Sequence, residues 1–329
     1  MSGFARLNLT LGAACVLALM LAVGFGETVL TGAQWRQAFV DAASGPADVL
    51  WHIRAPRALC ALLVGAALGL GGAVMQGLLR NPLAEPGVLG VSAGGGAAAA
   101  LAIVLGLGVV PGAVELTAVA GAGVVALALL AFVSRVSSPA GLILFGVALS
   151  ALGGAATSLV FNLAPTPLAA AEVMAWLMGS VENRGWTEVL WIAVPTAVAA
   201  ALAHACGPGL RGLALGEDTA RTLGLPVERL QVTALVAASL AAGAAVAVAG
   251  AIGFVGLVAP HLVRRFVRDD PARIWAPSAL AGGLILVAAD LAVRVIPTEQ
   301  ELKLGVLTAL VGAPLFALIA ARAARSWRS

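Results

Sequence analysis

The sequence predicts an all-α, polytopic membrane protein with about ten transmembrane helices. Of its 329 residues, 61% are hydrophobic and 11% are charged, and the mean hydropathy is +1.02. A soluble domain of this composition would expose large apolar patches. A bilayer core about 30 Å thick needs about 20 apolar residues per helix, and runs of that length recur along the whole chain. The 40 glycines suit close helix packing, because small residues let backbones approach.

The apolar runs divide a single membrane domain, residues 1–329, into ten expected spans. The run from Leu230 to Val263 is too long for one crossing, and Gly250 and Gly253 at its centre predict a break there. The first run has no convincing cleavage site, which favours a retained span over a signal peptide. The expected spans are 7–26, 57–79, 87–106, 113–134, 141–163, 189–210, 231–249, 251–267, 274–295 and 304–322.

The distribution of lysine and arginine predicts that both termini face the cytoplasm. With the N-terminus inside, cytoplasmic segments hold 13 of the 19 basic residues and outer segments hold 6. We therefore expect a multi-pass membrane protein in contact with lipid. The basic residues are scattered over loop ends without forming a stripe, so nucleic acid is not an expected partner.

Residue types that usually build reactive sites are dispersed. The cysteines (Cys15, Cys60 and Cys206) fall inside apolar runs, without disulfide or zinc spacing, and the three histidines are far apart. We therefore expect no catalytic, metal or cofactor-binding residues and no cofactor. The run Gly94–Ala97 lacks the lysine of a phosphate-binding loop, so ATP hydrolysis by this chain is not expected.

Two polar segments interrupt the apolar runs. In the first, between the second and third expected spans, two prolines four residues apart forbid continuous helix. Asn81 before Pro82 favours a tight turn there. An ordinary connector and a cytoplasmic gate at Asn81, Pro82 and Leu83 are both compatible with this pattern. In the second, acidic residues precede Gly224, which would end a first short helix, and Pro226 would open the next. The alternative is a solvated loop.

Four strings, taken in order, resemble the permease subunits of type II ABC importers for iron-siderophores, haem and cobalamin, a FecCD-like family. The strings cover 53–92, 213–226, 249–261 and 301–316. The resemblance implies ten helices per subunit and a homodimer around a central pathway. It also implies two separate ATP-binding cassette subunits and a periplasmic substrate-binding protein.

The resemblance also implies site residues. It assigns Arg54, Arg57 and Arg294 to docking of acidic residues of the binding protein, and the alternative is snorkelling to lipid phosphate. Positive charge at the outer start of a span is unusual, because both the inside preference and the helix dipole disfavour it. Coupling to the ATPase is implied for helices within 213–230, at Leu215, Gly216, Glu217, Asp218, Ala220, Arg221, Leu223 and Gly224.

Asp290 is the only acidic residue well inside a span, which makes it a functional candidate. It precedes Arg294 by four residues, so an ion pair that orients the arginine is the preferred interpretation. Candidates for lining the pathway are mostly large and apolar, and helix packing explains each equally well. These candidates are Met75, Gln76, Phe161 and Met174, with Trp176 and Met178 beside them.

The expected function is import of an iron-siderophore complex from periplasm to cytoplasm. The string Trp176–Ser180 resembles the siderophore branch, but the cobalamin branch has a similar one, so cobalamin and haem are the alternatives. A proton-coupled secondary carrier would need several intramembrane carboxylates or histidines, and this chain offers one. A non-transporting membrane scaffold is the remaining alternative.

Overall fold

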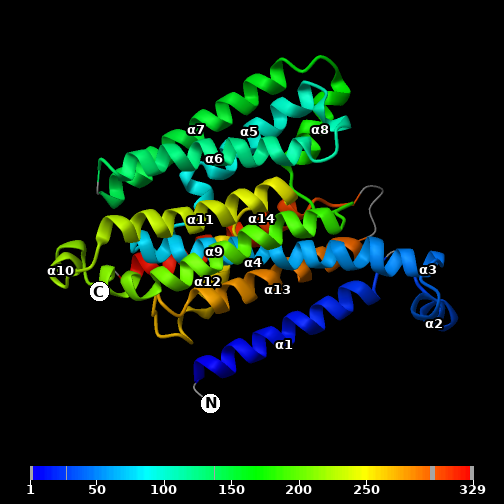
Figure 1. Cartoon of the computed structure of the whole chain (residues 1–329), viewed down its shortest axis with the longest axis horizontal. Helices are drawn as coiled ribbons and strands as arrows, with labels where there is room; N and C mark the ends of the chain where they lie inside the picture. The colour runs from blue at the N-terminus through cyan, green and yellow to red at the C-terminus, as the bar shows by residue number, and fades with distance from the viewer. Residues whose placement is uncertain (1–2, 27, 137, 297–300, 327–329) are drawn as a thin grey trace.

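The structure is a computed structural model that describes residues 3–26, 28–136, 138–296 and 301–326, with side chains as far as Leu318. The described residues form helices, turns and loops, and no strand occurs among them. The predicted all-α class is therefore confirmed. Most of the helices run roughly parallel along the long axis of the molecule (Figure 1).

Each of the ten expected spans overlaps one α-helix. The sequence positions of the helices agree with the expected spans to within a few residues at most ends, the chief exceptions being shorter helices in the third and eighth spans. The ten are α1 (Gly3–Gly24), α4 (Ala55–Leu79), α5 (Val91–Val104), α6 (Ala113–Val133), α7 (Pro139–Asn162), α9 (Trp186–Leu213), α11 (Val227–Ala249), α12 (Val255–Arg264), α13 (Trp275–Val295) and α14 (Leu304–Ser326).

Seven of the described segments are long and apolar enough to cross a membrane. Helices α5 and α12 are shorter apolar helices, as is the part of α14 whose side chains are described. These lengths are consistent with a multi-pass membrane protein, and the count of ten crossings stays a prediction.

Helix α4 occupies the middle of the bundle and packs against α9, α11, α12 and α13. Glycine makes this packing close: a methyl group at Gly65 would come within 2.2 Å of the carbonyl oxygen of Gly282 on α13. At Gly72 it would come within 1.8 Å of the carbonyl oxygen of Gly256 on α12. Backbone contacts of this kind replace the hydrophobic drive that lipid does not supply.

The predicted break in the long apolar run is confirmed. Helix α11 ends at Ala249, and Gly250 follows with a φ of +69°. A side chain there would also meet the carbonyl oxygen of Trp176 at 2.3 Å. Glycine is therefore required at this corner for both backbone and steric reasons.

The expectation of two short helices within 213–230 is half right. Helix α10 (Glu217–Thr222) is one of them, and Gly224 follows it with a φ of +78°. The second is absent as a separate helix: Val227 begins α11, which continues without interruption to Ala249. The charged first turn of α11 joins directly to an apolar run, so nothing in the sequence stops the helix at residue 230.

Several short helices were not expected from hydropathy. They are α2 (Gly32–Val40), α3 (Gly45–Asp48), η1 (Val49–Arg54), η2 (Pro86–Leu89), η3 (Leu107–Val109) and α8 (Pro167–Leu177). Helices α2 and α3 lie at one end of the bundle and α10 lies at the other (Figure 1). We call these the α3 end and the α10 end. Helix α1 begins toward the α10 end, and α14 runs toward the same end (Figure 1).

Candidate functional site

A charged cavity of about 610 Å³ opens at the α3 end, where α4 and η1 meet the end of α13 and the segment before α14. Small and apolar residues form part of its wall, but most of the long side chains around it are charged. The charged lining residues are Arg54, Arg57, Arg294, Lys303, Glu182 and Glu301. The structure thus brings all three arginines of the predicted docking set into one cavity.

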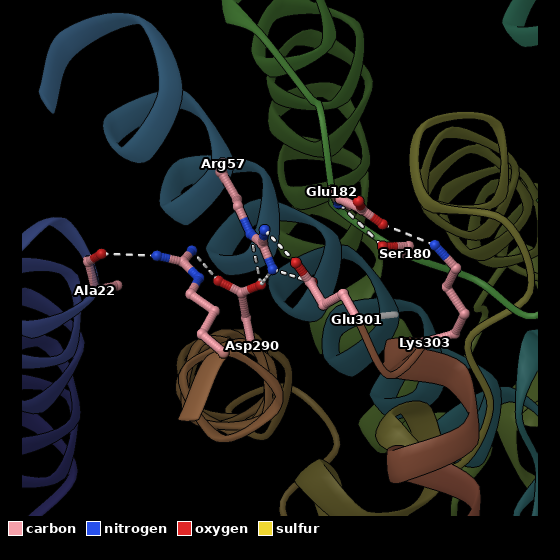
Figure 2. Close-up of polar contacts among 8 residues, drawn as sticks. Ala22, Arg57, Ser180, Glu182, Asp290, Glu301 and Lys303 are labelled. Carbon is pink, nitrogen blue, oxygen red and sulfur yellow. Dashed lines mark hydrogen bonds and ion pairs between the residues drawn. The ribbon is translucent and has the colours of Figure 1, made fainter. Parts of the chain in front are cut away.

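Arg57 lies between two carboxylates that come from different parts of the chain (Figure 2). Its Nε and Nη2 donate to Oδ1 of Asp290 at 2.9 and 2.8 Å, and its Nη1 donates to Oε2 of Glu301 at 2.9 Å. Nη2 also contacts Oε1 of Glu301. The Asp290 side chain is fully buried, and those of Arg57 and Glu301 are 12% exposed. This contact joins the start of α4 to α13 and to the entry of α14.

Arg294 completes the cluster from the other side. Its Nη2 pairs with Oδ2 of Asp290, so the ion pair predicted from the spacing of four residues is confirmed. Its Nη1 donates to the carbonyl oxygen of Ala22 on α1 at 2.9 Å. Asp290 therefore holds two arginines at once and helps to connect α1, α4 and α13. The sequence indicated only one of these pairs, because Arg57 is 233 positions away from Asp290.

Arg54 has a different environment from the other two arginines. It is 5% exposed and donates to the backbone carbonyl oxygens of Val23, Gly24 and Thr28, the first two at 3.3 and 3.0 Å. A side chain at Gly26 would meet the Arg54 guanidinium at 2.9 Å, so glycine fits the loop around it. Arg54 thus fixes the chain that leaves α1 at the rim of the cavity.

Lys303 and Glu182 form the opposite wall of the cavity (Figure 2). Lys303 Nζ lies 2.7 Å from Oε2 of Glu182, whose backbone N–H donates to Ser180 Oγ at 3.0 Å. Two residues further on, the N–H of Gly305 donates to the carbonyl oxygen of Gly179 at 3.2 Å. The segment before α14 is therefore attached to the loop after α8. Neither Glu182 nor Lys303 was singled out from the sequence, where they are ordinary loop charges.

The charges around the cavity nearly balance. Four basic side chains line it, two carboxylates share the lining, and Asp290 lies behind them. The carboxylates compensate most of the arginine charge, and the small positive remainder favours an acidic partner.

At the α10 end, the predicted ATPase-contact residues form a compact projection. Gln231 Nε2 donates to Oε1 of Glu217 at 2.7 Å, and Arg221 pairs with Glu228 at 2.5 Å, so α10 is attached to the start of α11. Ala220 is buried, Leu223 is 62% exposed, and Leu215, just before the helix, is 66% exposed. Exposed leucines beside charged groups suit contact with another protein.

The polar segment after α4 is a tight turn. Asn81 Oδ1 accepts from the N–H of Leu83 at 2.9 Å, and the Asn81 carbonyl oxygen accepts from the N–H of Ala84 at 3.1 Å. Arg80 precedes it with a φ of +51°. The geometry is that of a connector fixed by its asparagine side chain, and a gating role for Asn81, Pro82 and Leu83 stays a prediction.

The four residues expected to line the pathway fall into two groups. Phe161 and Met174 are 40% and 47% exposed, but Met75 is fully buried and Gln76 is 5% exposed. Other helices surround α4 within the protomer, and lining of the pathway by these four residues stays a prediction. Met75 packs in the core, and Gln76 Oε1 accepts a hydrogen bond from Arg264 on α12.

The described residues thus form an apolar helical bundle with a buried charge cluster at one end and a projecting helix at the other. The chain belongs to the FecCD transport family, whose model matches residues 14–322. It is similar to the vitamin B12 import system permease protein BtuC of Salmonella schwarzengrund (strain CVM19633), with 40% identity over 97% of this chain and 96% of the relative. BtuC of Salmonella typhi is 39% identical over the same shares.

The comparison with solved structures agrees with this family assignment. A solved structure described as an inward-facing conformation of a transporter assigned to the metal-chelate type of ABC transporters has a TM-score of 0.86 and 28% identity. The match covers 97% of this chain and 99% of that one. The chain is therefore an ABC importer permease subunit. Members of this family work with ATP-binding subunits and substrate-binding proteins, and ATP hydrolysis belongs to a separate subunit.

Proposed function

We propose that this chain is the membrane-spanning subunit of an ATP-driven importer for vitamin B12 or a closely related corrinoid. The observation that carries the proposal is the 40% identity to vitamin B12 permeases over 97% of the chain. In this proposal it crosses the bacterial inner membrane about ten times, with both termini in the cytoplasm.

An iron-siderophore is the second candidate, and haem belongs to the same group of bulky metal chelates. The observation that favours a chelate of this kind is the similarity to a transporter of the metal-chelate type. That similarity amounts to 28% identity, against 40% for the vitamin B12 permeases. We therefore place vitamin B12 first.

Uptake by cells distinguishes these substrates. The permease and its partner subunits are expressed in a strain that lacks its own B12 and siderophore permeases, and uptake of labelled vitamin B12 and of a labelled ferric siderophore is measured. We expect saturable B12 uptake that excess unlabelled ferric siderophore does not reduce. Siderophore uptake without B12 uptake would contradict the substrate assignment and leave the importer class intact.

We propose three kinds of protein partner and a contact surface for each. Two ATP-binding cassette subunits would contact α10, one per protomer. A second copy of the chain would associate through α7, whose most apolar stretch is only 6% buried within the protomer and needs either lipid or protein against it. Helix α1, 17% buried over its most apolar stretch, is proposed to contact lipid.

The third partner, a periplasmic substrate-binding protein, would dock over the cavity at the α3 end. In this proposal Arg57 and Arg294 offer positive charge to acidic side chains, and Arg54 holds the rim in place. Charge reversal at Arg57 tests the docking, with Arg36→Glu as the matched control because Arg36 is exposed on α2 at the same end but outside the cavity. Arg57→Glu should weaken binding of the binding protein strongly and Arg36→Glu little; equal effects would remove the cavity from the interface.

A further inference from the structure

We propose that Glu301 is an internal substitute for a carboxylate of the binding protein. In the resting subunit it occupies Arg57, and it gives up that arginine when the binding protein docks. This inference rests on the proposed docking at the cavity, and it identifies the contact that docking must break.

The hydrogen bonds of Arg57 favour such an exchange. A guanidinium group has five N–H bonds. Among the described residues, Arg57 uses Nε, both hydrogens of Nη2 and one hydrogen of Nη1 in contacts with Asp290 and Glu301. One N–H is left, so an incoming carboxylate cannot form the two parallel bonds that make arginine–carboxylate pairs strong. A two-bond pair between Arg57 and a partner carboxylate therefore needs one resident carboxylate to leave.

Glu301, rather than Asp290, is the carboxylate able to leave. Asp290 has no exposed surface, belongs to α13 and also pairs with Arg294. Glu301 is 12% exposed, lines the cavity and lies on the non-helical stretch before α14. Among the described residues its only ion pair is with Arg57. When Glu301 leaves, Asp290 still holds Arg57, and this arginine alone is left for the partner to neutralise.

The exchange would also carry a signal to α14. Three consecutive attachments hold the segment that enters this helix: Glu301 to Arg57, Lys303 to Glu182, and Gly305 to Gly179. Docking that replaces Glu301 removes the first attachment while the partner occupies the same arginine. Binding outside is thereby linked to the freedom of a membrane helix without any displacement of Asp290 from the core.

The competition between Glu301 and the partner's carboxylate for Arg57 determines whether a substitution at Glu301 strengthens or weakens binding. In the wild type, one carboxylate is exchanged for another at Arg57, so much of the electrostatic gain of docking cancels. Glu301→Gln keeps the shape and removes the charge, so the partner meets an arginine that is only half compensated. We expect Kd for the binding protein to fall about tenfold at low salt, with a steeper loss of affinity as salt rises.

The experiment measures Kd of the purified binding protein for the permease–ATPase complex in lipid nanodiscs, at low and high salt. The matched control is Glu115→Gln: Glu115 forms a similarly buried pair with Arg184, at 2.9 Å and with 13% and 19% exposed side chains, outside the cavity. It should keep the wild-type Kd. Glu301→Asp keeps the charge on a shorter side chain, so its Kd should lie between those of wild type and Glu301→Gln. If Glu301→Gln does not assemble, Glu301→Asp alone tests the exchange.

The outcomes separate the exchange from docking itself. Tighter binding by Glu301→Gln together with weaker binding by Arg57→Gln supports the exchange. Unchanged or weaker binding by both Glu301 variants, with Arg57→Gln still weakened, overturns the exchange and leaves docking in place. An Arg57→Gln complex with wild-type affinity overturns the docking proposal, and the exchange with it.

Discussion

At the level of single residues, Asp290 holds two arginines at once. It is fully buried, and its two oxygens bind arginines that begin α4 and end α13. Arg294 in turn binds the α1 backbone at Ala22. A buried charge pair is often no more stabilising than a well-packed apolar contact, but removal of one partner leaves uncompensated charge in the interior.

Asp290→Asn should therefore destabilise the subunit strongly. Neutralising it leaves both arginines without their shared counter-charge, and we expect a loss of about 3–5 kcal/mol in the free energy of unfolding. Thermal unfolding of the detergent-purified protein measures this. Glu182→Gln is the control, because the half-exposed pair with Lys303 should contribute at most about 1 kcal/mol. Equal shifts for the two variants would show that Asp290 does not organise the cluster.

A second residue, Glu85, should make the stability of the protein depend on pH. Glu85, in the loop before η2, is half-buried beside the start of α12, and burial raises its pKa to about 7. Because this folded-state pKa lies above the usual value of 4.5, the folded protein binds the proton more tightly than the unfolded chain. The contribution of Glu85 to stability is therefore largest below about pH 4.5 and is lost as pH rises through 7.

Glu85→Gln should remove that part of the pH dependence. We expect its melting temperature to fall less than that of wild type as the pH rises from about 5 to about 8, across the titration of Glu85. Melting curves at several pH values measure the difference. Parallel curves for the two proteins would mean that Glu85 does not titrate in this range.

At the level of elements, the sequence predicted the long apolar helices. It predicted neither the short helices nor burial that depends on neighbouring helices. The break at Gly250 followed from an apolar run too long for one crossing. Helices α2 and α8 were missed because neither is long enough to stand out in hydropathy, although Thr31 and Gln34 form a capping box at the start of α2. The burial of Met75 depends on the helices around α4, which no local pattern specifies.

Within the site, sequence spacing could indicate only contacts along one helix. The pair between Asp290 and Arg294 was predictable because residues four apart share a helix face. Glu301 was visible as part of a family string, but its contact with Arg57 joins residues 244 positions apart. Such contacts depend on the arrangement of α4, α13 and α14, and hydropathy contains no information about it.

Helix α10 gives a prediction at this scale. Gly224 has a φ of +78° and no atoms close to where a side chain would extend, so a substitution acts only through the backbone. Gly224→Val should cost about 1–2 kcal/mol locally and distort the end of α10. The subunit should insert normally but co-purify poorly with its ATPase. Gly224→Asn, which tolerates this conformation better, should retain most of the complex; wild-type co-purification by the valine variant would remove α10 from the interface.

At the scale of the whole molecule, the two ends differ in kind. The α3 end holds a charged cavity, and the α10 end holds a projecting helix flanked by exposed leucines. The start of α1 and the α10 projection lie toward the same end (Figure 1). An importer that receives cargo on one side and force on the other needs this asymmetry. The bias of lysine and arginine predicts that the α10 end faces the cytoplasm.

A fusion experiment tests the orientation. Alkaline phosphatase, which is active only outside the cytoplasm, should be inactive when fused after Ser329 and active when inserted near Asp41 at the end of α2. A cytoplasmic reporter such as green fluorescent protein at the same two positions should give the reverse pattern. Phosphatase activity at the C-terminus with none near Asp41 would invert every assignment of inner and outer surfaces.

In the proposed function, this chain forms the pathway and a separate ATPase supplies the energy. Proteoliposomes that contain the permease and its ATPase, with ATP inside and the binding protein outside, measure this directly as uptake of labelled vitamin B12. We expect uptake that requires ATP and is abolished when the phosphate-loop lysine of the ATPase is replaced, whatever the proton gradient. Uptake that persists in that ATPase variant and follows an imposed proton gradient would instead make the chain a secondary carrier.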